Sequence, residues 1–258
     1  MGRLDRGWGI LRSLAVYYGI PWRHRMMRRF YGGFIRPGDL CFDIGAHVGN
    51  RVRAWKSLGA RVVALEPQPD FYRLLLRLYG GSGTVTVLDR AAGAEAGEMT
   101  MHVSSASPTL GTLSPRWMRT VKEVETFRRV RWDVTLSVTV TTLDDLIDRF
   151  GEPVFCKIDV EGFEEEVLEG LSRPLRALSF EFLPADADAA AACLRRIDAM
   201  ESYEFNYSAV ETMRLAWPQW RDADSVERFL RSRPRTGRSG DVYARLKEPV
   251  PRNEPEPR

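Results

Sequence analysis

A glycine turn that follows an acidic residue is the first chemical signal in this chain. The segment 40–50 contains Asp43, Gly45 and Gly49, between an apolar run and a helix-like pattern. Glycine lets the backbone approach a ligand closely because it has no Cβ atom. A dinucleotide fingerprint would contain a third glycine, and a carboxylate here would repel a pyrophosphate. The turn therefore favours a ligand with an ammonium group, and the alternative is a tight strand–helix turn without a ligand.

Glu66 ends the next apolar run, at residues 61–65, and Pro67 follows it. A carboxylate in this position accepts hydrogen bonds from both hydroxyls of a ribose. S-adenosylmethionine combines a ribose with an ammonium group and a sulfonium, and it has no phosphate. We therefore predict that S-adenosylmethionine is the cofactor. The alternative for Glu66 is a helix cap or a solvated acid.

Residues 88–93 end a third apolar run, over the position that adenine takes in a doubly wound sheet. We predict that either the Asp89 carboxylate or the Ala91 backbone contacts the exocyclic amine of adenine. Arg90 fits this contact and an ordinary polar turn equally well.

Two acidic residues, Asp159 and Glu161, follow a fourth apolar run that ends near residue 158. Being two residues apart, they would point the same way in a continuing strand. The carboxyl end of this strand meets the first strand at the switch point, where ligands bind. One carboxylate can act there as a general base toward a hydroxyl or steady a sulfonium, and a pair can hold a divalent metal. The alternative is that Glu161 caps the next helix, with Lys157 as its ion-pair partner.

The remaining candidates are one acid and two histidines. Glu181 lies between two aromatic residues of the next core strand, so it either lines the acceptor pocket or is satisfied internally. His47, in the glycine turn, and His102 are candidate bases because histidine titrates near neutrality, although a single histidine is more often structural. No histidine or cysteine spacing matches a metal site, so we assign no metal ligands.

Alternating strands and helices must position these residues. Such alternation is typical of an α/β fold with a doubly wound, mostly parallel sheet and helices on both faces. We expect strands near residues 40–44, 61–65, 84–88, 153–158, 176–182, 202–207 and 241–246. We expect helices near residues 49–58, 69–79, 142–150, 163–170, 187–200 and 222–232.

The chain is expected to have three parts. Residues 1–36 carry eight arginines and one acidic residue, and we predict that they form a basic helical extension. Residues 37–247 form the main domain. Within it, segment 94–140 interrupts the alternation with two extra strands and a serine-rich loop, as an inserted lid would. Residues 248–258 contain four prolines and are expected to be disordered.

Composition limits the partners and the location. The net charge of +3 argues against general nucleic-acid binding. No apolar stretch approaches the ~20 residues of a membrane span, and no signal peptide is recognisable, so we expect a cytoplasmic protein. The basic N-terminal segment either docks on anionic lipid or an acidic polymer, or packs on the sheet edge with solvated arginines. Three widely spaced cysteines, at 41, 156 and 193, fit a reducing compartment better than a disulfide framework. Cys41 and Cys156 fall inside apolar strands and are expected to be buried, and Cys193 is the third thiol.

Four motifs occur together at residues 42–49, 64–67, 142–146 and 157–162, reading FDIGAHVG, ALEP, TLDDL and KIDVEG. The combination resembles the FkbM family of S-adenosylmethionine-dependent methyltransferases over roughly residues 35–185. The resemblance implies a seven-stranded methyltransferase sheet whose last strand is antiparallel. It also implies methyl transfer to an oxygen of a small-molecule or carbohydrate acceptor, such as a sugar, a glycan or a natural product. The alternatives are a cofactor-binding module without catalysis, which would lack the acids of the fourth strand, and a nicotinamide-dependent oxidoreductase, which would keep the third glycine.

The resemblance also implies roles for individual residues. The glycine turn would surround the methionine part of the cofactor and Glu66 would hold the ribose, with the serine-rich loop 104–111 near the acceptor. The chain departs from the family's pattern at His47, where asparagine is common, and after Glu181, where a histidine is common. The implied cofactor-binding set is Asp43, Gly45, Ala46, Gly49, Glu66, Asp89, Arg90, Ala91 and Asp159. The candidate catalytic set is Asp159, Glu161, Glu181 and His47.

Overall fold

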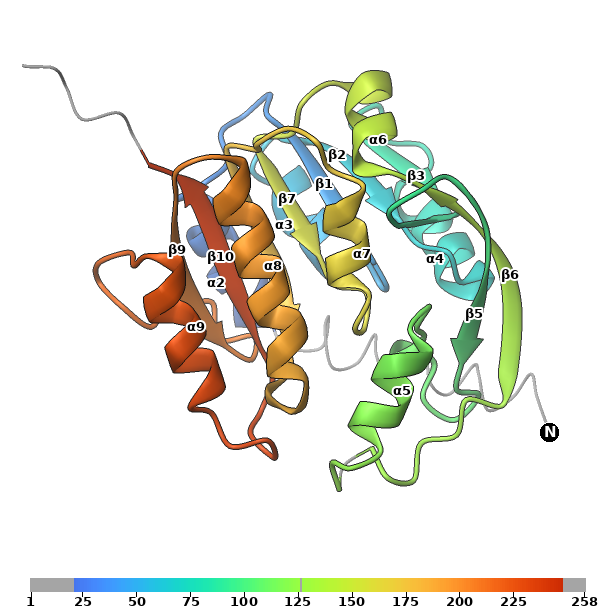
Figure 1. Cartoon of the computed structure of the whole chain (residues 1–258). Helices are drawn as coiled ribbons and strands as arrows, with labels where there is room; N and C mark the ends of the chain where they lie inside the picture. The colour runs from blue at the N-terminus through green and yellow to red at the C-terminus, as the bar shows by residue number, and fades with distance from the viewer. Residues whose placement is uncertain (1–20, 126, 248–258) are drawn as a thin grey trace, which may run out of the picture.

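A seven-stranded sheet forms the middle layer of the structure, a computed structural model that describes residues 21–125 and 127–247 (Figure 1). The strand order is β3-β2-β1-β7-β8-β10-β9. The last strand, β10, runs antiparallel to both of its neighbours, and the pairs β1–β2, β2–β3, β1–β7 and β7–β8 are parallel. The predicted mostly parallel sheet with an antiparallel last strand is confirmed. The predictions for residues 1–20 and for the tail 248–258 lie outside the described residues.

The predicted strands and helices are present, with ends within two residues of those expected. The strands of the large sheet are β1 (Leu40–Ile44), β2 (Arg61–Leu65), β3 (Val85–Leu88), β7 (Phe155–Ile158), β8 (Ala177–Phe182), β9 (Tyr203–Ala209) and β10 (Gly240–Leu246). The helices around it are α2 (Pro21–Tyr31), α3 (Asn50–Lys56), α4 (Pro69–Tyr79), α6 (Leu143–Phe150), α7 (Glu164–Glu169), α8 (Ala187–Met200) and α9 (Ala223–Arg231).

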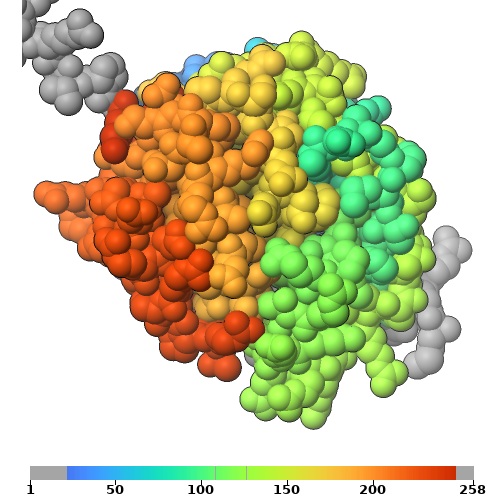
Figure 2. Space-filling model, in the orientation of Figure 1, coloured from blue at the N-terminus to red at the C-terminus, as the bar shows by residue number. Residues whose placement is uncertain are grey.

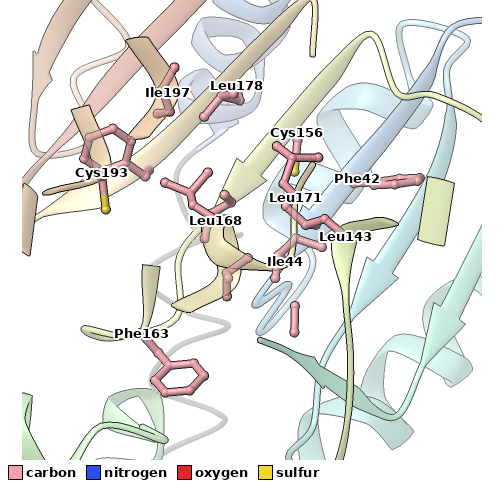
Figure 3. Packing of buried hydrophobic residues seen from close by; sticks show 14 of the residues in the cluster. Phe42, Ile44, Leu143, Cys156, Phe163, Leu168, Leu171, Leu178, Cys193 and Ile197 are labelled. Carbon is pink, nitrogen blue, oxygen red and sulfur yellow. The ribbon is translucent and has the colours of Figure 1, made fainter. Parts of the chain in front are cut away.

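The pleat of β1 divides the core into two layers, because successive side chains of a strand point to opposite faces. Leu40, Phe42 and Ile44 join the cluster under α6, α7, α8 and α9. Phe42 and Ile44 are labelled in Figure 3. Cys41 joins the cluster under α2, α3 and α4 on the other face. Cys41 and Cys156 are buried free thiols, as predicted, and Cys193 is buried as well. Asp43 shares the face of Cys41, so its side chain points toward α2 and α3.

Aromatic rings hold α2 against the sheet. Tyr31 is fully buried and makes edge contacts with Trp55 of α3 and Phe155 of β7, at centroid distances of 5.3 and 5.5 Å. Met27, one turn earlier, is 5% exposed. Each such ring pair adds about 0.5–1.5 kcal/mol beyond the burial of its area. The described part of the basic N-terminal segment therefore packs on the sheet through one face of a helix.

The TLDDL motif is a helix start. Thr142 accepts a hydrogen bond from the Asp145 backbone N–H, and the Asp145 carboxylate accepts one from the Thr142 N–H, at 3.0 and 3.2 Å. This reciprocal capping box satisfies two N–H groups that a helix terminus otherwise leaves unpaired. The neighbouring Asp144 accepts a bond from the backbone N–H of Ser172, which follows α7. The motif thus sets where α6 begins and ties it to the next helix.

The inserted segment forms a short helix and two strands, which pair with a third strand just before it to make a small sheet. Strands β4 (Arg90–Ala92), β5 (Gly97–Val103) and β6 (Val134–Thr141) pair in the order β4-β6-β5, and the 3-10 turn η1 (Pro108–Leu110) and α5 (Pro115–Val121) connect β5 to β6. The sequence predicts β5 and β6 but neither β4 nor α5. Trp117 of α5 meets the rings of Phe127 and Trp132 edge-on, at 6.0 Å each. The part of the segment around α5 forms the green lobe at the lower right of Figure 2.

A glycine substitution tests how tightly the turn after β1 is packed. Gly49 has a φ of 76°, and a Cβ atom on it would lie 2.6 Å from Leu75 and 2.9 Å from Tyr79. A left-handed non-glycine residue costs about 1–2 kcal/mol, and overpacking costs about 1–3 kcal/mol. We expect Gly49→Ala to lower the free energy of unfolding in urea by about 2–4 kcal/mol. Gly83→Ala is the control, because nothing lies within 4 Å of its added Cβ; equal effects of the two variants would contradict this packing.

Candidate active site

A cavity of about 340 Å³ opens at the carboxyl edge of the sheet. Its walls come from the turn after β1, the ends of β2, β7 and β8, the start of β10, and the inserted segment. Thr109, Gly111 and Leu113 of the inserted segment line the cavity opposite the strand ends. This volume is in the range of sites that hold small-molecule ligands, about 300–1,000 Å³. The position is the switch point at which doubly wound sheets bind ligands.

Glu66 is fixed in the cavity wall by two backbone donors. It is 3% exposed, and its two carboxylate oxygens accept hydrogen bonds from the N–H groups of His47 and Gln68, each at 2.9 Å. An ionised carboxylate has about four acceptor positions, so two remain for a ligand. Burial raises the pKa of Glu66 to about 7, although both backbone donors work in the opposite direction. The group is therefore a preoriented acceptor for paired hydroxyls.

Three carboxylates of the cavity wall converge at the ends of β7 and β8. One oxygen each from Asp159, Glu161 and Glu181 lies within 4.8 Å of the other two. Burial, reinforced by the charge of Asp159, holds the pKa of Glu161 and of Glu181 well above the usual range. Two like charges this close disfavour full ionisation. Among the described residues, this is the one acid, histidine or cysteine group whose atoms are close enough to hold a metal ion.

Two buried cations balance this acidic cluster. Lys157 is fully buried, and its ammonium lies 2.8 Å from Asp241 and 3.4 Å from Asp159. Arg51 lies 3.1 Å from the same Asp159 oxygen. Burial acts to raise the pKa of Asp159, but Lys157 and Arg51 together bring it below its usual value. Asp159 is therefore ionised at neutral pH, whereas Glu161 and Glu181 retain their protons more readily.

Arg51 is a site residue that the sequence reasoning missed. It lies in the first turn of α3, is 8% exposed, lines the cavity, and also lies 3.8 Å from Glu211. Its Nε is buried without a hydrogen-bond partner among the described residues. The one available signal was its place directly after the glycine turn, where the N-terminus of a helix favours an anionic ligand.

The loop after β7 does not continue as a strand, which corrects one prediction. β7 ends at Ile158, and Glu161 has a φ of 55° and Gly162 a φ of 85°. The expectation that Asp159 and Glu161 point the same way because of strand alternation is therefore wrong. Their carboxylates meet because the chain turns. The alternative that Glu161 caps α7 is also wrong, because Phe163 is the N-cap residue.

Contacts from two sides hold this loop. The Thr112 hydroxyl donates to the Glu161 carbonyl at 2.7 Å, and the ring of Trp117 fills the space where a Gly162 side chain would lie. On the side of α7, the Glu164 carboxylate accepts hydrogen bonds from the N–H groups of Val160 and Gly162, at 3.0 and 3.3 Å. The inserted segment and the first turn of α7 thus fix the backbone that presents Glu161. Sequence reasoning missed Thr112 and Glu164.

Four predicted cofactor residues do not line the cavity, and each has a physical reason. The Asp43 carboxylate is fully buried on the α2–α3 face of β1, where burial raises its pKa to about 6. Ala46 is 2% exposed and belongs to the core cluster on that face. Gly49 faces α4 instead of the cavity, and Asp89 is exposed at the surface.

The other predicted cofactor residues line the cavity. Gly45, Glu66, Arg90, Ala91 and Asp159 are all part of its wall. Gly45 has a second constraint, because its φ is 83° and an added Cβ atom would lie 2.0 Å from the Asp159 carbonyl oxygen. The glycine therefore allows β1 and β7 to end side by side, independently of any ligand.

The two candidate histidines are placed differently. His47 is part of the cavity wall, and its ring lies against Phe71, with 4.2 Å between ring centroids. Burial lowers the pKa of His47 to about 4, which makes the imidazole neutral but weakly basic at neutral pH. Its backbone N–H holds Glu66. His102 pairs through its backbone with Thr112 and is not part of the cavity wall.

Comparison with known proteins identifies the family of this chain. The model of the FkbM methyltransferase domain matches residues 43–233, well over half of the chain. The hexuronic acid methyltransferase AglP of Haloferax volcanii is 27% identical over 145 residues, which are 55% of this chain and 54% of that protein. The chain thus spans about half the length of this curated relative.

Two solved structures of similar shape have low sequence identity to this chain. A putative O-methyltransferase from Klebsiella pneumoniae has a TM-score of 0.47 and 9% identity, covering 93% of this chain and 90% of that chain. An O-methyltransferase from Bacillus cereus, in complex with SAH, has a TM-score of 0.46 and 11% identity at the same coverage. On the family match, this chain belongs to the FkbM methyltransferases, and its cofactor is S-adenosylmethionine.

Proposed function

We propose that the protein transfers a methyl group from S-adenosylmethionine to a hydroxyl oxygen of a sugar, a glycan or a related small molecule. The observation that carries this proposal is the meeting of Asp159, Glu161 and Glu181 at the carboxyl edge of the sheet. A carboxylate beside the acceptor suits a hydroxyl, which must lose a proton. The similarity to a hexuronic acid methyltransferase supports a carbohydrate acceptor.

The cavity wall offers suitable partners for each part of the cofactor. Glu66 has two free acceptor positions for the ribose hydroxyls, and Arg51 offers a buried cation for the carboxylate of the methionine part. Ionised Asp159 suits the positive charges of the ammonium and sulfonium groups. When bound, S-adenosylmethionine supplies an activated methyl group on its sulfonium.

In the proposed step, the chain mainly aligns and deprotonates the acceptor. The hydroxyl oxygen forms a bond to the methyl carbon as the bond from carbon to sulfur breaks, and the proton passes to a carboxylate. We assign that carboxylate to Glu161, with Glu181 orienting the hydroxyl and Asp159 staying ionised. The raised pKa of Glu161 makes its ionised form a stronger base than an ordinary carboxylate. Holding the reacting atoms in line contributes the rest of the acceleration.

The ribose assignment predicts a pH-dependent affinity. Glu66 has a pKa of about 7, and only its ionised form accepts bonds from both hydroxyls. Cofactor affinity therefore rises with pH through neutrality, roughly tenfold from about pH 6 to about pH 8. Calorimetric titration of S-adenosylmethionine across this range measures the rise. In Glu66→Gln the cofactor affinity should be weak and should not rise with pH over this range.

Two further variants control for the fold and for position. Glu66→Ala should abolish cofactor binding while circular dichroism and the unfolding transition stay close to those of the parent. Asp89→Ala should leave affinity unchanged, because Asp89 is exposed outside the cavity. Near-normal affinity of Glu66→Ala would contradict the ribose assignment.

If Glu161 is the base, its substitution should lower the rate of methyl transfer without a large change in cofactor affinity. Glu161→Gln should keep cofactor affinity within a few-fold and lower methyl transfer by about 10²–10⁴-fold, the usual contribution of a general base. Transfer is measured as label that passes from methyl-labelled cofactor to a cell extract. Glu169→Gln, an exposed glutamate on α7, is the matched control. Transfer by Glu161→Gln equal to that of the control would exclude Glu161 as the base.

A further inference from the structure

The solvent-facing side of α2 has an unusual composition. Trp22 is 65% exposed and Met26 is 36% exposed, which makes them two of the exposed large hydrophobic side chains of the described chain. Arg25 and Arg29 are also exposed, and Arg25, Met26 and Arg29 follow Trp22 by three, four and seven residues. Residues at this spacing share one face of a helix. We call this face the Trp22 stripe, and it contains no acidic residue.

The stripe is held facing outward. Met27 and Tyr31, on the opposite side of α2, are buried against the sheet. The adjacent helix α3 exposes two further basic residues, Arg53 and Lys56. No helix within the described ranges 21–125 and 127–247 is long and apolar enough to cross a bilayer.

The preceding sequence has the same chemistry as the stripe. Residues 1–20 combine Arg3, Arg6 and Arg12 with apolar and aromatic residues, among them Trp8 and Tyr17. Asp5 is the single acid in residues 1–36. A basic and aromatic composition therefore extends over the whole stretch that ends in α2, and this stretch precedes the family match at residue 43.

We propose that the Trp22 stripe is a docking surface for an anionic lipid bilayer. An indole ring partitions into the interfacial region, where one side is apolar and the other is wet. Arginine guanidinium groups pair with lipid phosphates and are attracted by the negative surface potential. The stripe offers both features and no opposing charge. This proposal does not depend on which acceptor the enzyme methylates.

Docking through this face would bring the cavity close to the lipid headgroups. Arg23, the residue after Trp22, lines the cavity and lies 3.7 Å from Glu211. The helix that carries the stripe therefore also forms part of the cavity rim. An acceptor attached to or concentrated at a membrane surface would be presented to the site.

Vesicle sedimentation of the full chain tests the proposal. The probes are phosphatidylcholine vesicles with and without phosphatidylserine, at low and at high salt. We expect binding to the anionic vesicles that weakens with salt. Arg25→Ala/Arg29→Ala should lower the partition coefficient roughly 30-fold, since each basic residue near an anionic surface contributes about fivefold. Trp22→Ala should weaken binding at both salt concentrations, because the contribution of the ring is not screened.

Matched controls lie on α4, where the same residue types are exposed. Arg73→Ala/Arg77→Ala removes two exposed arginines at the same spacing, and Leu78→Ala removes a side chain that is 47% exposed. Both should bind like the parent chain, and all variants should retain the parent's cofactor affinity. The proposal would be overturned if the α4 control pair lost as much vesicle binding as the α2 pair, or if the chain bound neutral and anionic vesicles equally. Heparin serves as an acidic polymer without lipid, and binding of the chain to a heparin column but not to vesicles would also overturn the proposal.

Discussion

The carboxylates of the cavity can lie side by side because a fully buried ammonium group, that of Lys157, stands beneath them. Its strand position places it between β1 and β8, on the same face as Asp43 and Ser179. Lys157 and Arg51 keep Asp159 ionised, and that charge adds to burial in raising the pKa of Glu161 and of Glu181. Removing one partner of such a buried pair typically costs about 3–5 kcal/mol, since the other charge is left uncompensated. Stability and the protonation pattern of the site thus depend on the same contacts.

The backbone of the site is as constrained as its charges. Gly45 lets β1 end against the Asp159 carbonyl, and Glu164 holds the loop after β7 from the helix side. The inserted segment adds Thr112 and Trp117 on the opposite side of that loop. A segment expected to act as a lid therefore also supports the acidic loop. Substitutions in this segment would therefore change the position of the proposed base as well as the contacts with the acceptor.

Much of the fold could be predicted because strand and helix periods are local properties of the sequence. The acidic ends of β2, β7 and β8 could be placed at one edge for the same reason. The roles of the motifs were less readable, because tertiary contacts decide them. Gly49 is required by Leu75 and Tyr79 of α4, and the TLDDL motif is a capping box.

The predicted residues that lie outside the cavity wall and the site residues that were missed share one cause. Asp43 was assigned to the ligand, but the pleat turns it to the α2–α3 side, and no motif reveals which face a buried strand presents. Arg51 could not be recognised as a counter-charge because its partner Asp159 lies far away in the chain. Pairings across the sheet follow from strand order, which is a property of the fold and not of any single motif.

The central claim is that the acidic edge of the cavity deprotonates a hydroxyl for methyl transfer. Identifying the methylated atom tests this most directly. A cell extract is incubated with the protein and methyl-labelled S-adenosylmethionine, and the labelled product is analysed by mass spectrometry and NMR. The account predicts a methyl ether on a hydroxyl oxygen of a carbohydrate or related molecule. A label on nitrogen, carbon or a carboxylate oxygen would contradict it.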